Sequence, residues 1–465
     1  MDQEASQTPW LSRLGVNILQ ELGLMALINS NIDIKLLIAQ RFVRLIAYGG
    51  STLILVSYLS TLGISDTRIG LFMTLTLIGD VFISFFLTLI TDSIGRRFML
   101  ALGAAMMAGS GVIFALFDNY FILLAAAILG IISPSGNEIG PFRAIEESTL
   151  AHLSLPDDRA SIFAYYNLIG SLGAAIGMMA CGWVVHTLQA HHGFEIIASY
   201  RVIFFAYAGV GLIKLGLTMI LSNACELQPE PKPIHNEETP LLGNQTLQSS
   251  ARSKQQRRPL LPQISRESRG IFLTLALLFA LDNLGSSIAP LAWITNYFKR
   301  RFGLSENLLG SLFFTTSIIQ AISVLVAASL ARRIGNVKTM VFTHLPSSIA
   351  LAALGLPASL PVAMALLLFR ASTQSMDSAP RSAFLAAILL PNERTAIMGA
   401  INVVKTASQS IGPVITGQLV ERDMFWIAFL MAGGMKVVYD LSLLAVFANR
   451  QTRENAEEVN EGESG

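Results

Sequence analysis

The chain has 465 residues, of which 52% are hydrophobic and only 14% are charged, and its formal net charge is +1. Soluble domains carry about a quarter of charged residues, so this composition excludes an ordinary soluble globular protein. The near-zero charge also argues against nucleic acid as a partner, because nucleic-acid binding normally needs a basic patch. We therefore expect the lipid bilayer to be part of the solvent of this chain.

Continuous apolar runs of about twenty residues recur along the sequence, which is the length that a helix needs to span a bilayer. Because these runs do not alternate with polar residues, they predict helices rather than the strands of a membrane barrel. The fold class is thus an all-α polytopic membrane protein with twelve transmembrane helices. The predicted spans lie near residues 42–62, 69–90, 98–117, 121–142, 162–188, 202–221, 271–298, 308–331, 339–356, 362–385, 397–420 and 425–447.

The segments outside the spans are polar, and the central one is rich in Pro, Ser and charge, a composition that predicts a flexible linker. Its basic residues, together with Arg96 and Arg97 in an earlier loop, place these loops in the cytoplasm, and with them both termini. Five parts are expected: a cytoplasmic N-terminal segment with an interfacial helix at residues 10–28 (1–41), a first six-helix half (42–221), a linker (222–269), a second six-helix half (270–447) and an acidic cytoplasmic tail (448–465).

The two halves repeat each other without gaps over two stretches. Half of the repeated positions are glycines, and transporters commonly place their solute site near the midplane between two such repeats. The matched pairs are Ser65 and Ser305, Gly70 and Gly310, Gly95 and Gly335, then Pro156 and Pro391, Arg159 and Arg394, Asn167 and Asn402, Gly177 and Gly412, Gly182 and Gly417. This duplication is the strongest functional signal in the sequence.

The loop after the second predicted span reads Thr88-Leu-Ile-Thr-Asp92-Ser-Ile-Gly95-Arg96-Arg97. It resembles the G-x-L-a-D-r-x-G-R-r pattern of the major facilitator superfamily, although it departs from that pattern at positions 88 and 93. The resemblance covers 42–447 and implies two six-helix halves that work by alternating access. Gly95 permits a tight turn, and Asp92 can cap or pair with a neighbouring helix, so these residues and the two arginines form a predicted conformational latch. A simple topology determinant is the alternative.

The fifth predicted span contains Gly173 and Gly177, whose spacing is similar to the antiporter motif of the drug/proton branch of that family. Met178 stands where the motif has proline, and the proline occurs instead in the other half, in Gly412-Pro413. Small residues four positions apart let helix backbones approach closely. They suit contacts that rock or hinge between the halves, and equally an ordinary tight helix packing.

Ionisable residues inside spans are costly and are functional candidates by default. Glu138 precedes Pro141 by three residues in the fourth span, and Asp377 precedes Pro380 by three in the tenth. Because proline interrupts a helix, this pattern predicts two broken helices that present their carboxylates to a solute or a proton. We interpret Glu138 and Asp377 as coupling carboxylates, with permanent structural ion pairs as the alternative.

Several basic and acidic residues accompany these two carboxylates. Arg381 lies four positions after Asp377 and Arg370 seven before it, so all three are expected on one helix face. Asp282 begins a polar patch that is expected on a cavity wall. Lys405 either binds an anion or extends its amine to the membrane surface.

Three further expectations concern the first half. Arg143 is a candidate for the solute or proton site, but Glu146 and Glu147 are expected at a cytoplasmic helix end, paired with it. Asp80 is expected to pair with Arg44.

Nucleophile elbows, zinc-ligand spacings and phosphate-binding loops are absent from the sequence, so we expect no enzyme, no metal and no cofactor. The predicted function is secondary active transport of a small solute, with proton-coupled efflux of small organic compounds as the leading form. Uptake of a polar or anionic solute is an alternative, and a non-transporting membrane sensor is an alternative of another class. The expected partners are the solute, protons and lipid, and the expected state is a monomer.

The sequence leaves the membrane of residence open between the plasma membrane and a vacuolar or lysosomal membrane. The linker contains Glu237-Glu-Thr-Pro-Leu241-Leu242, which fits the acidic dileucine pattern for sorting to the latter.

Overall fold

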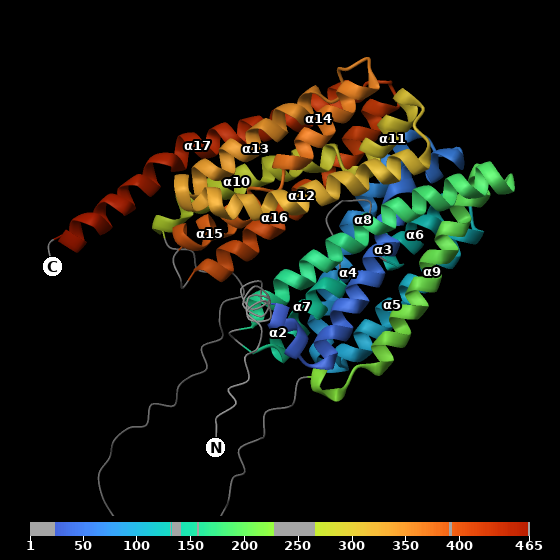
Figure 1. Ribbon diagram of the computed structural model, residues 1–465, viewed down its shortest axis with the longest axis horizontal. Helices are drawn as coiled ribbons and strands as arrows, with labels where there is room; N and C mark the ends of the chain where they lie inside the picture. Colours follow the sequence, from blue (N-terminus) through green and yellow to red (C-terminus); the bar gives the residue numbers. More distant parts are fainter. Residues whose placement is uncertain are drawn as a thin grey trace, which may run out of the picture.

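The computed structural model describes residues 24–130, 132, 141–155, 158–226, 266–389 and 393–463. All regular elements within these ranges are helices (Figure 1). The first half contains α2 (Leu24–Asn29), α3 (Ile32–Thr61), α4 (Asp66–Ile94), α5 (Arg96–Leu116), α6 (Tyr120–Gly130), α7 (Pro141–Leu153), α8 (Arg159–His192), α9 (Ile196–Ile220) and the 3-10 helix η1 (Asn223–Cys225). The second half contains α10 (Arg266–Ile288), α11 (Leu291–Phe302), α12 (Glu306–Ile334), α13 (Asn336–Ala353), α14 (Leu360–Thr373), α15 (Ser378–Ile388), α16 (Arg394–Val420) and α17 (Phe425–Glu463).

These helices supply the twelve predicted spans. Eight helical segments of the described chain are long and apolar enough to cross a bilayer by length and composition. The tenth span is divided into α14 and α15, which confirms the predicted break at Asp377. The fourth span is divided into α6 and α7, but Glu138 lies outside the described residues. The seventh span is divided as well, at Pro290, a break that we did not predict; proline lacks the N–H that would continue the helix.

Several predicted boundaries differ from the structure. The first spanning helix begins at Ile32 rather than near residue 42, because the buried Ile34, Leu37 and Ile38 extend its apolar face toward the N-terminus. At the other end of the chain, α17 continues through the predicted acidic tail to Glu463. The predicted interfacial helix falls mostly on residues outside the described ranges, as do most of the linker and its dileucine pattern.

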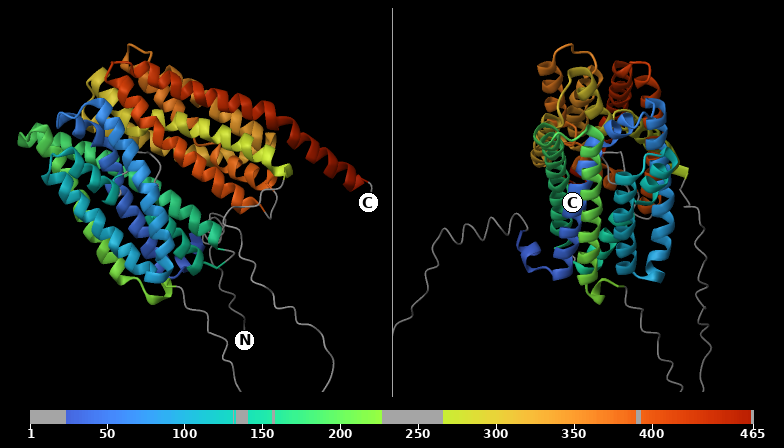
Figure 2. Two further views of the ribbon diagram at one scale, coloured as in Figure 1. Left: turned by 180° about the vertical axis from the view of Figure 1, so that it is seen from behind. Right: turned by 90° about the vertical axis from the view of Figure 1, so that its right-hand side faces the viewer.

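The two halves are separate bundles that meet at one end. In Figures 1 and 2 the blue-to-green bundle and the yellow-to-red bundle diverge from this meeting point. Here α8 packs along α12, α4 packs along α16, and α11 packs against α3. We call this the closed end; it carries the loops 62–65, 193–195, 303–305 and 421–424. The opposite, open end carries the turns at Gly95 and Gly335 and both ends of the described chain.

Repeated glycines form the contact between the halves. Gly70 of α4 lies against Gly417 of α16, and Gly310 of α12 lies against Gly182 of α8. A methyl group added at any of the four would overlap backbone atoms of the opposing helix. Because Gly70 and Gly310 are one repeated pair and Gly182 and Gly417 are another, the two contacts are equivalent when the halves are exchanged. The sequence duplication thus builds a symmetric closed end.

Ion pairs add to the closed end. Arg300, in the last turn of α11 in the second half, donates two hydrogen bonds of 2.7 and 2.6 Å to the carboxylate of Asp66 in the first half. The buried Glu306 of α12 accepts hydrogen bonds from the Lys299 amine (2.5 Å) and from the Tyr200 hydroxyl of α9 (3.0 Å). The Arg300–Asp66 and Tyr200–Glu306 contacts join the halves at this end, and the cavity described below lies between the halves.

We predict that Gly417→Ala opens the closed end, because overpacking a tight contact costs about 1–3 kcal/mol, enough to shift a conformational equilibrium about tenfold. The measurement is the labelling rate of Met73→Cys, a cavity position, by an impermeant thiol reagent added on the closed-end side, in a background without the two native cysteines. The rate should rise several-fold. The control is Gly434→Ala, where the added methyl meets nothing within 4 Å. Equal rates in both variants would contradict the assigned contact.

Candidate functional site: a cavity beside a buried ionic network

A cavity of about 1130 Å³ lies between the two halves, a size at the upper end of small-molecule sites. Helices α3, α4 and α8 of the first half line one wall, and helices of the second half line the other. The described residues of the first wall are uncharged and include Tyr48, Thr52, Met73, Tyr165, Asn167, Ser171 and Met178. The second wall includes Ser286, Gln320, His344, Arg370, Gln374, Ser375 and Lys436. A small solute could therefore contact both halves at once.

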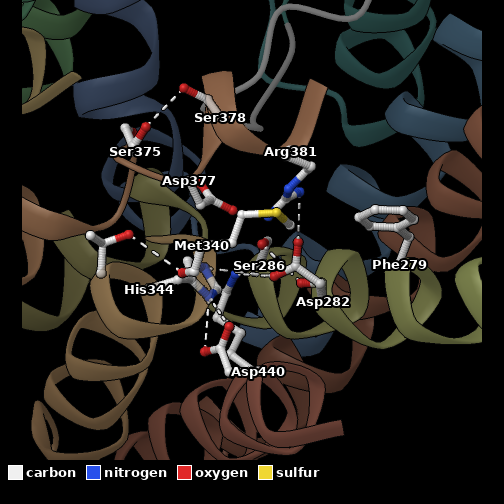
Figure 3. A network of polar contacts seen from close by, with 12 residues as sticks. Phe279, Asp282, Ser286, Met340, His344, Ser375, Asp377, Ser378, Arg381 and Asp440 are labelled. Carbon is white, nitrogen blue, oxygen red and sulfur yellow. Dashed lines mark hydrogen bonds and ion pairs between the residues drawn. The ribbon is translucent and has the colours of Figure 1, made fainter. Parts of the chain in front are cut away.

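A buried ionic network stands behind the second wall (Figure 3). Asp282 of α10 is its centre: it accepts hydrogen bonds from Lys436 of α17 (2.7 Å) and from Arg381 of α15 (3.1 Å). Arg381 also pairs with Asp377 at the break between α14 and α15. We call the following six groups the Asp282 network: Asp282, His344, Asp377, Arg381, Lys436 and Asp440.

His344 of α13 joins the remaining carboxylate to this centre. Its Nδ1 lies 2.8 and 2.9 Å from the two carboxylate oxygens of Asp440, and its Nε2 lies 3.9 Å from Asp282. Ser348 donates a hydrogen bond of 3.0 Å to the same Asp440 carboxylate. His344 thus stands between two acids, and both it and Lys436 reach the cavity wall. The network is buried among helices yet accessible from the cavity.

A second ionic network holds the first half together. Glu146 of α7 is fully buried and accepts hydrogen bonds from Lys214 of α9 (2.6 Å), Arg44 of α3 (2.8 Å) and the hydroxyl of Tyr166 on α8 (2.7 Å). This arrangement corrects two predictions. Glu146 is not at an exposed helix end with Arg143, and Arg44 pairs with Glu146 rather than with Asp80. The helical geometry explains the first error, since neighbouring residues point in different directions and only Glu147 faces Arg143.

The structure brings together some of the predicted site residues and separates others. Asp377, Arg381 and Asp282 meet in one network. Of these contacts, only the Asp377–Arg381 pair was predicted from the sequence. Arg370 instead lines the cavity, because α14 ends at Thr373 and no continuous helix face connects it with Asp377. Lys405 of α16 lies with its amine 5.8 Å from the centre of a neighbouring phenylalanine ring. Arg143 pairs with the partly exposed Glu147 and does not line the cavity.

Three residues of the network, His344, Lys436 and Asp440, were not predicted as site residues from the sequence, although each lies within a predicted span. The rule that ionisable residues inside spans are functional candidates would have found them. Lys214 was missed in the same way.

The predicted latch residues make contacts within the first half. Gly95 has a φ of 110°, which favours glycine, and it precedes α5. The carboxylate of Glu226 accepts hydrogen bonds from the backbone N–H groups of Arg96 (2.7 Å) and Arg97 (3.0 Å), so it caps α5. The Arg97 guanidinium bonds to Asn223 (2.5 Å). The side chain of Asp92 lies outside the described part, and its latch role stays a prediction.

The predicted hinge residues pack closely against neighbouring helices. Gly173 and Gly177 of α8 lie against the backbone of α3, and Gly412 of α16 lies against the end of α10. Pro413 lines the cavity, and its carbonyl lies against α4 of the first half. The two prolines that follow the helix breaks stand near the starts of their helices, Pro141 as the first residue of α7 and Pro380 as the third of α15.

No group of three His, Cys, Asp or Glu residues in the described ranges could hold a metal ion.

Comparisons with known proteins agree with this architecture. The model of the Major Facilitator Superfamily matches residues 37–281 and 271–464. An uncharacterized membrane protein of Saccharomyces cerevisiae (strain ATCC 204508 / S288c), YJR124C, is 34% identical over 430 residues, which cover 89% of this chain and 94% of that protein.

Two solved transporters have a similar fold. The D-xylose-proton symporter superposes with a TM-score of 0.65 at 15% identity, covering 89% of this chain and 97% of that one. The nucleoside transporter NupG superposes with a TM-score of 0.63 at 15% identity, covering 89% and 99%.

We predict that Glu146→Gln strongly destabilises the first half, because it leaves Arg44 and Lys214 as buried cations without their shared carboxylate. Breaking a buried ion pair in this way costs about 3–5 kcal/mol. The neighbouring Glu147→Gln is the matched control, since its pair with Arg143 is partly exposed and surface pairs contribute about 0–1 kcal/mol. The measurement is the apparent melting temperature in detergent. Similar melting temperatures for the two variants would refute the structural role of Glu146.

Proposed function

The chain belongs to the major facilitator superfamily, and on this premise we propose that it is a proton-coupled secondary active transporter that carries a small solute by alternating access. The observation that carries the proposal is a cavity between two repeated halves whose wall reaches a buried network with one uncompensated charge. The halves touch at the closed end along α4–α16 and α8–α12, where four glycines meet, and through the Arg300–Asp66 ion pair, so a separation there would expose the cavity to that side.

The charge count of the Asp282 network supports a proton site. Among the described residues, the carboxylates of the network pair directly with two permanent cations, Arg381 and Lys436, so the three carboxylates and two cations carry one net negative charge when His344 is neutral. An uncompensated charge in the low-dielectric interior of a membrane protein is costly. One proton removes it: a protonated His344 donates from Nδ1 to Asp440 and places its positive charge 3.9 Å from Asp282 at Nε2. We assign the proton to the pair His344–Asp440.

The groups around His344 do not supply the missing charge. Tyr439 packs edge-on against the imidazole, with ring centres 5.9 Å apart, and contributes a neutral phenol. Lys405 of α16 is electrostatically coupled to Asp282 and Asp377, but in the described part of the chain it makes no hydrogen bond or ion pair with the six groups, and neither does Arg370 of α14. The fold itself accommodates proton coupling, since one of the similar structures is a D-xylose-proton symporter.

The orientation in the membrane follows from the basic residues at the open end. Arg96, Arg97, Arg332 and Arg333 flank the turns there, and basic loops face the cytoplasm. The proposal therefore places the open end, both termini and the linker in the cytoplasm, with the cavity facing inward. Export and uptake remain the two candidate directions, and they differ in the sign of the proton gradient that drives accumulation.

We predict that His344→Gln uncouples transport from the proton gradient. The variant should lose gradient-driven accumulation in proteoliposomes and retain solute exchange at equal pH, because the cavity stays intact while the proton site is lost. Cationic, neutral and anionic solutes are tested, with both signs of the gradient. Asp440→Asn should behave similarly.

The control for this experiment is His191→Gln, which changes an exposed histidine at the end of α8. Glu138→Gln and Asp377→Asn complete the set and test the coupling carboxylates predicted from the sequence. If His344→Gln keeps full gradient dependence while either of these two loses it, the proton site is not the one assigned here.

A further inference from the structure

The second wall of the cavity carries an arginine without a counter-charge. Arg370 lies in the last turn of α14, is partly exposed and lines the cavity. In the part of the chain that the structure describes, no carboxylate contacts it. The other two basic groups of this wall are committed elsewhere: Lys436 bonds to Asp282, and His344 bonds to Asp440. Arg370 is therefore the positive charge that a solute would meet.

Neutral hydrogen-bonding groups line the same wall of the cavity as this arginine. Gln374 follows it by four residues, one helical turn on, and its amide donates a hydrogen bond of 3.1 Å to Gln320 of α12. The amide of Gln320 donates in turn to the hydroxyl of Ser375. All three side chains line the cavity beside Arg370. A guanidinium with adjacent amides and a hydroxyl is the donor set that recognises an oxyanion.

The described lining of the cavity offers a positively charged solute no carboxylate to bind directly. Among the described residues that line it, none is Asp or Glu. The opposing wall offers hydroxyl and amide groups, such as those of Tyr48, Asn167 and Ser171, and the thioether of Met178. A cation would approach Arg370 without a counter-ion, whereas an anion would neutralise a guanidinium that is costly to keep unpaired at membrane depth.

We infer that the transported solute is a small organic anion whose carboxylate or phosphate binds Arg370, with Gln320 and Gln374 as further donors and its uncharged body against the first half. This inference rests on the proposed transport function and names its substrate class. Arg370 fits both oxyanions, because its planar fork can donate two parallel hydrogen bonds to either.

The first experiment measures the charge preference of the cavity and needs no transport. Gln374→Cys, in a background without the native cysteines, is labelled with a sulfonate-bearing and with a trimethylammonium-bearing methanethiosulfonate reagent. The anionic reagent should react about tenfold faster relative to its rate with a free thiol, and adding Arg370→Gln should bring the ratio close to one. Arg422→Gln, an exposed change in a closed-end loop, should leave the ratio unchanged.

The second experiment identifies the solute class with matched pairs in proteoliposomes: a carboxylic acid against its amide, and a sugar phosphate against the free sugar. The wild type should carry an acid or a phosphate and not its neutral partner. Arg370→Gln should reduce this flux at least tenfold. Arg370→Lys keeps the charge without the fork, so it should retain part of the flux and also show that the position tolerates substitution. Whether the wild type prefers the carboxylic acid or the sugar phosphate then shows whether the bound oxyanion is a carboxylate or a phosphate.

The outcomes distinguish the two proposals. An equal or cation-favouring reagent ratio, or neutral solutes carried at undiminished rates by Arg370→Gln, overturns the anion site even where His344→Gln still abolishes proton coupling. An anion-favouring ratio that depends on Arg370, together with flux that ignores the proton gradient, upholds the anion site and overturns the coupling mechanism.

Discussion

The low dielectric of the bilayer makes a buried charge without a partner costly, and each half of this protein is organised around one buried carboxylate with two basic partners. Glu146 ties together the first, fourth and sixth spans of the first half through Arg44 and Lys214. Asp282 ties together the same three spans of the second half through Arg381 and Lys436. In the first half the carboxylate lies on the fourth span and an arginine on the first span. In the second half the carboxylate lies on the first span and the arginine on the fourth, while the lysine stays on the sixth. The duplicated fold thus keeps the position of its ionic centre while exchanging the residues.

The two centres differ in their access to the cavity, and this difference assigns their roles. None of Glu146, Arg44 and Lys214 lines the cavity, so the first centre is a fixed support. In the second centre, Lys436 and His344 reach the wall, and a third carboxylate makes the charge sum depend on one proton. The same arrangement of spans therefore supports the fold in one half and holds the proposed proton site in the other. The glycine contacts of the closed end remain symmetric, as a motion between the halves requires.

The sequence predicted the number and order of the spans, the break in the tenth span and the Asp377–Arg381 pair, because hydropathy, proline position and helical spacing are local properties. It failed where partners come from distant spans. The predicted pair of Asp80 and Arg44 joins neighbouring spans, whereas the observed partner of Arg44 is Glu146, which lies 102 positions further along the chain. The prediction that Arg370 and Asp377 share a helix face also failed. The spacing rule behind it assumes a continuous helix, but α14 ends at Thr373, between the two residues. His344 could have been selected as an ionisable residue inside a span, but its proposed role depends on its contact with Asp440, which lies 96 positions further along the chain.

The positions of the proposed proton and anion sites give a physical reason for coupling them. Arg370 ends α14 on one side of the break in the tenth span, and Asp377 and Arg381 of the network lie on the other side. The empty sites carry opposite charges, one positive at Arg370 and one negative in the network. Binding a monoanion neutralises the first site and binding a proton neutralises the second. A carrier with both or neither bound therefore has no net charge in these two sites, whereas a half-loaded carrier has one. Since enclosing a net charge at membrane depth is costly, the half-loaded states are disfavoured during the conformational change, and proton and anion move together.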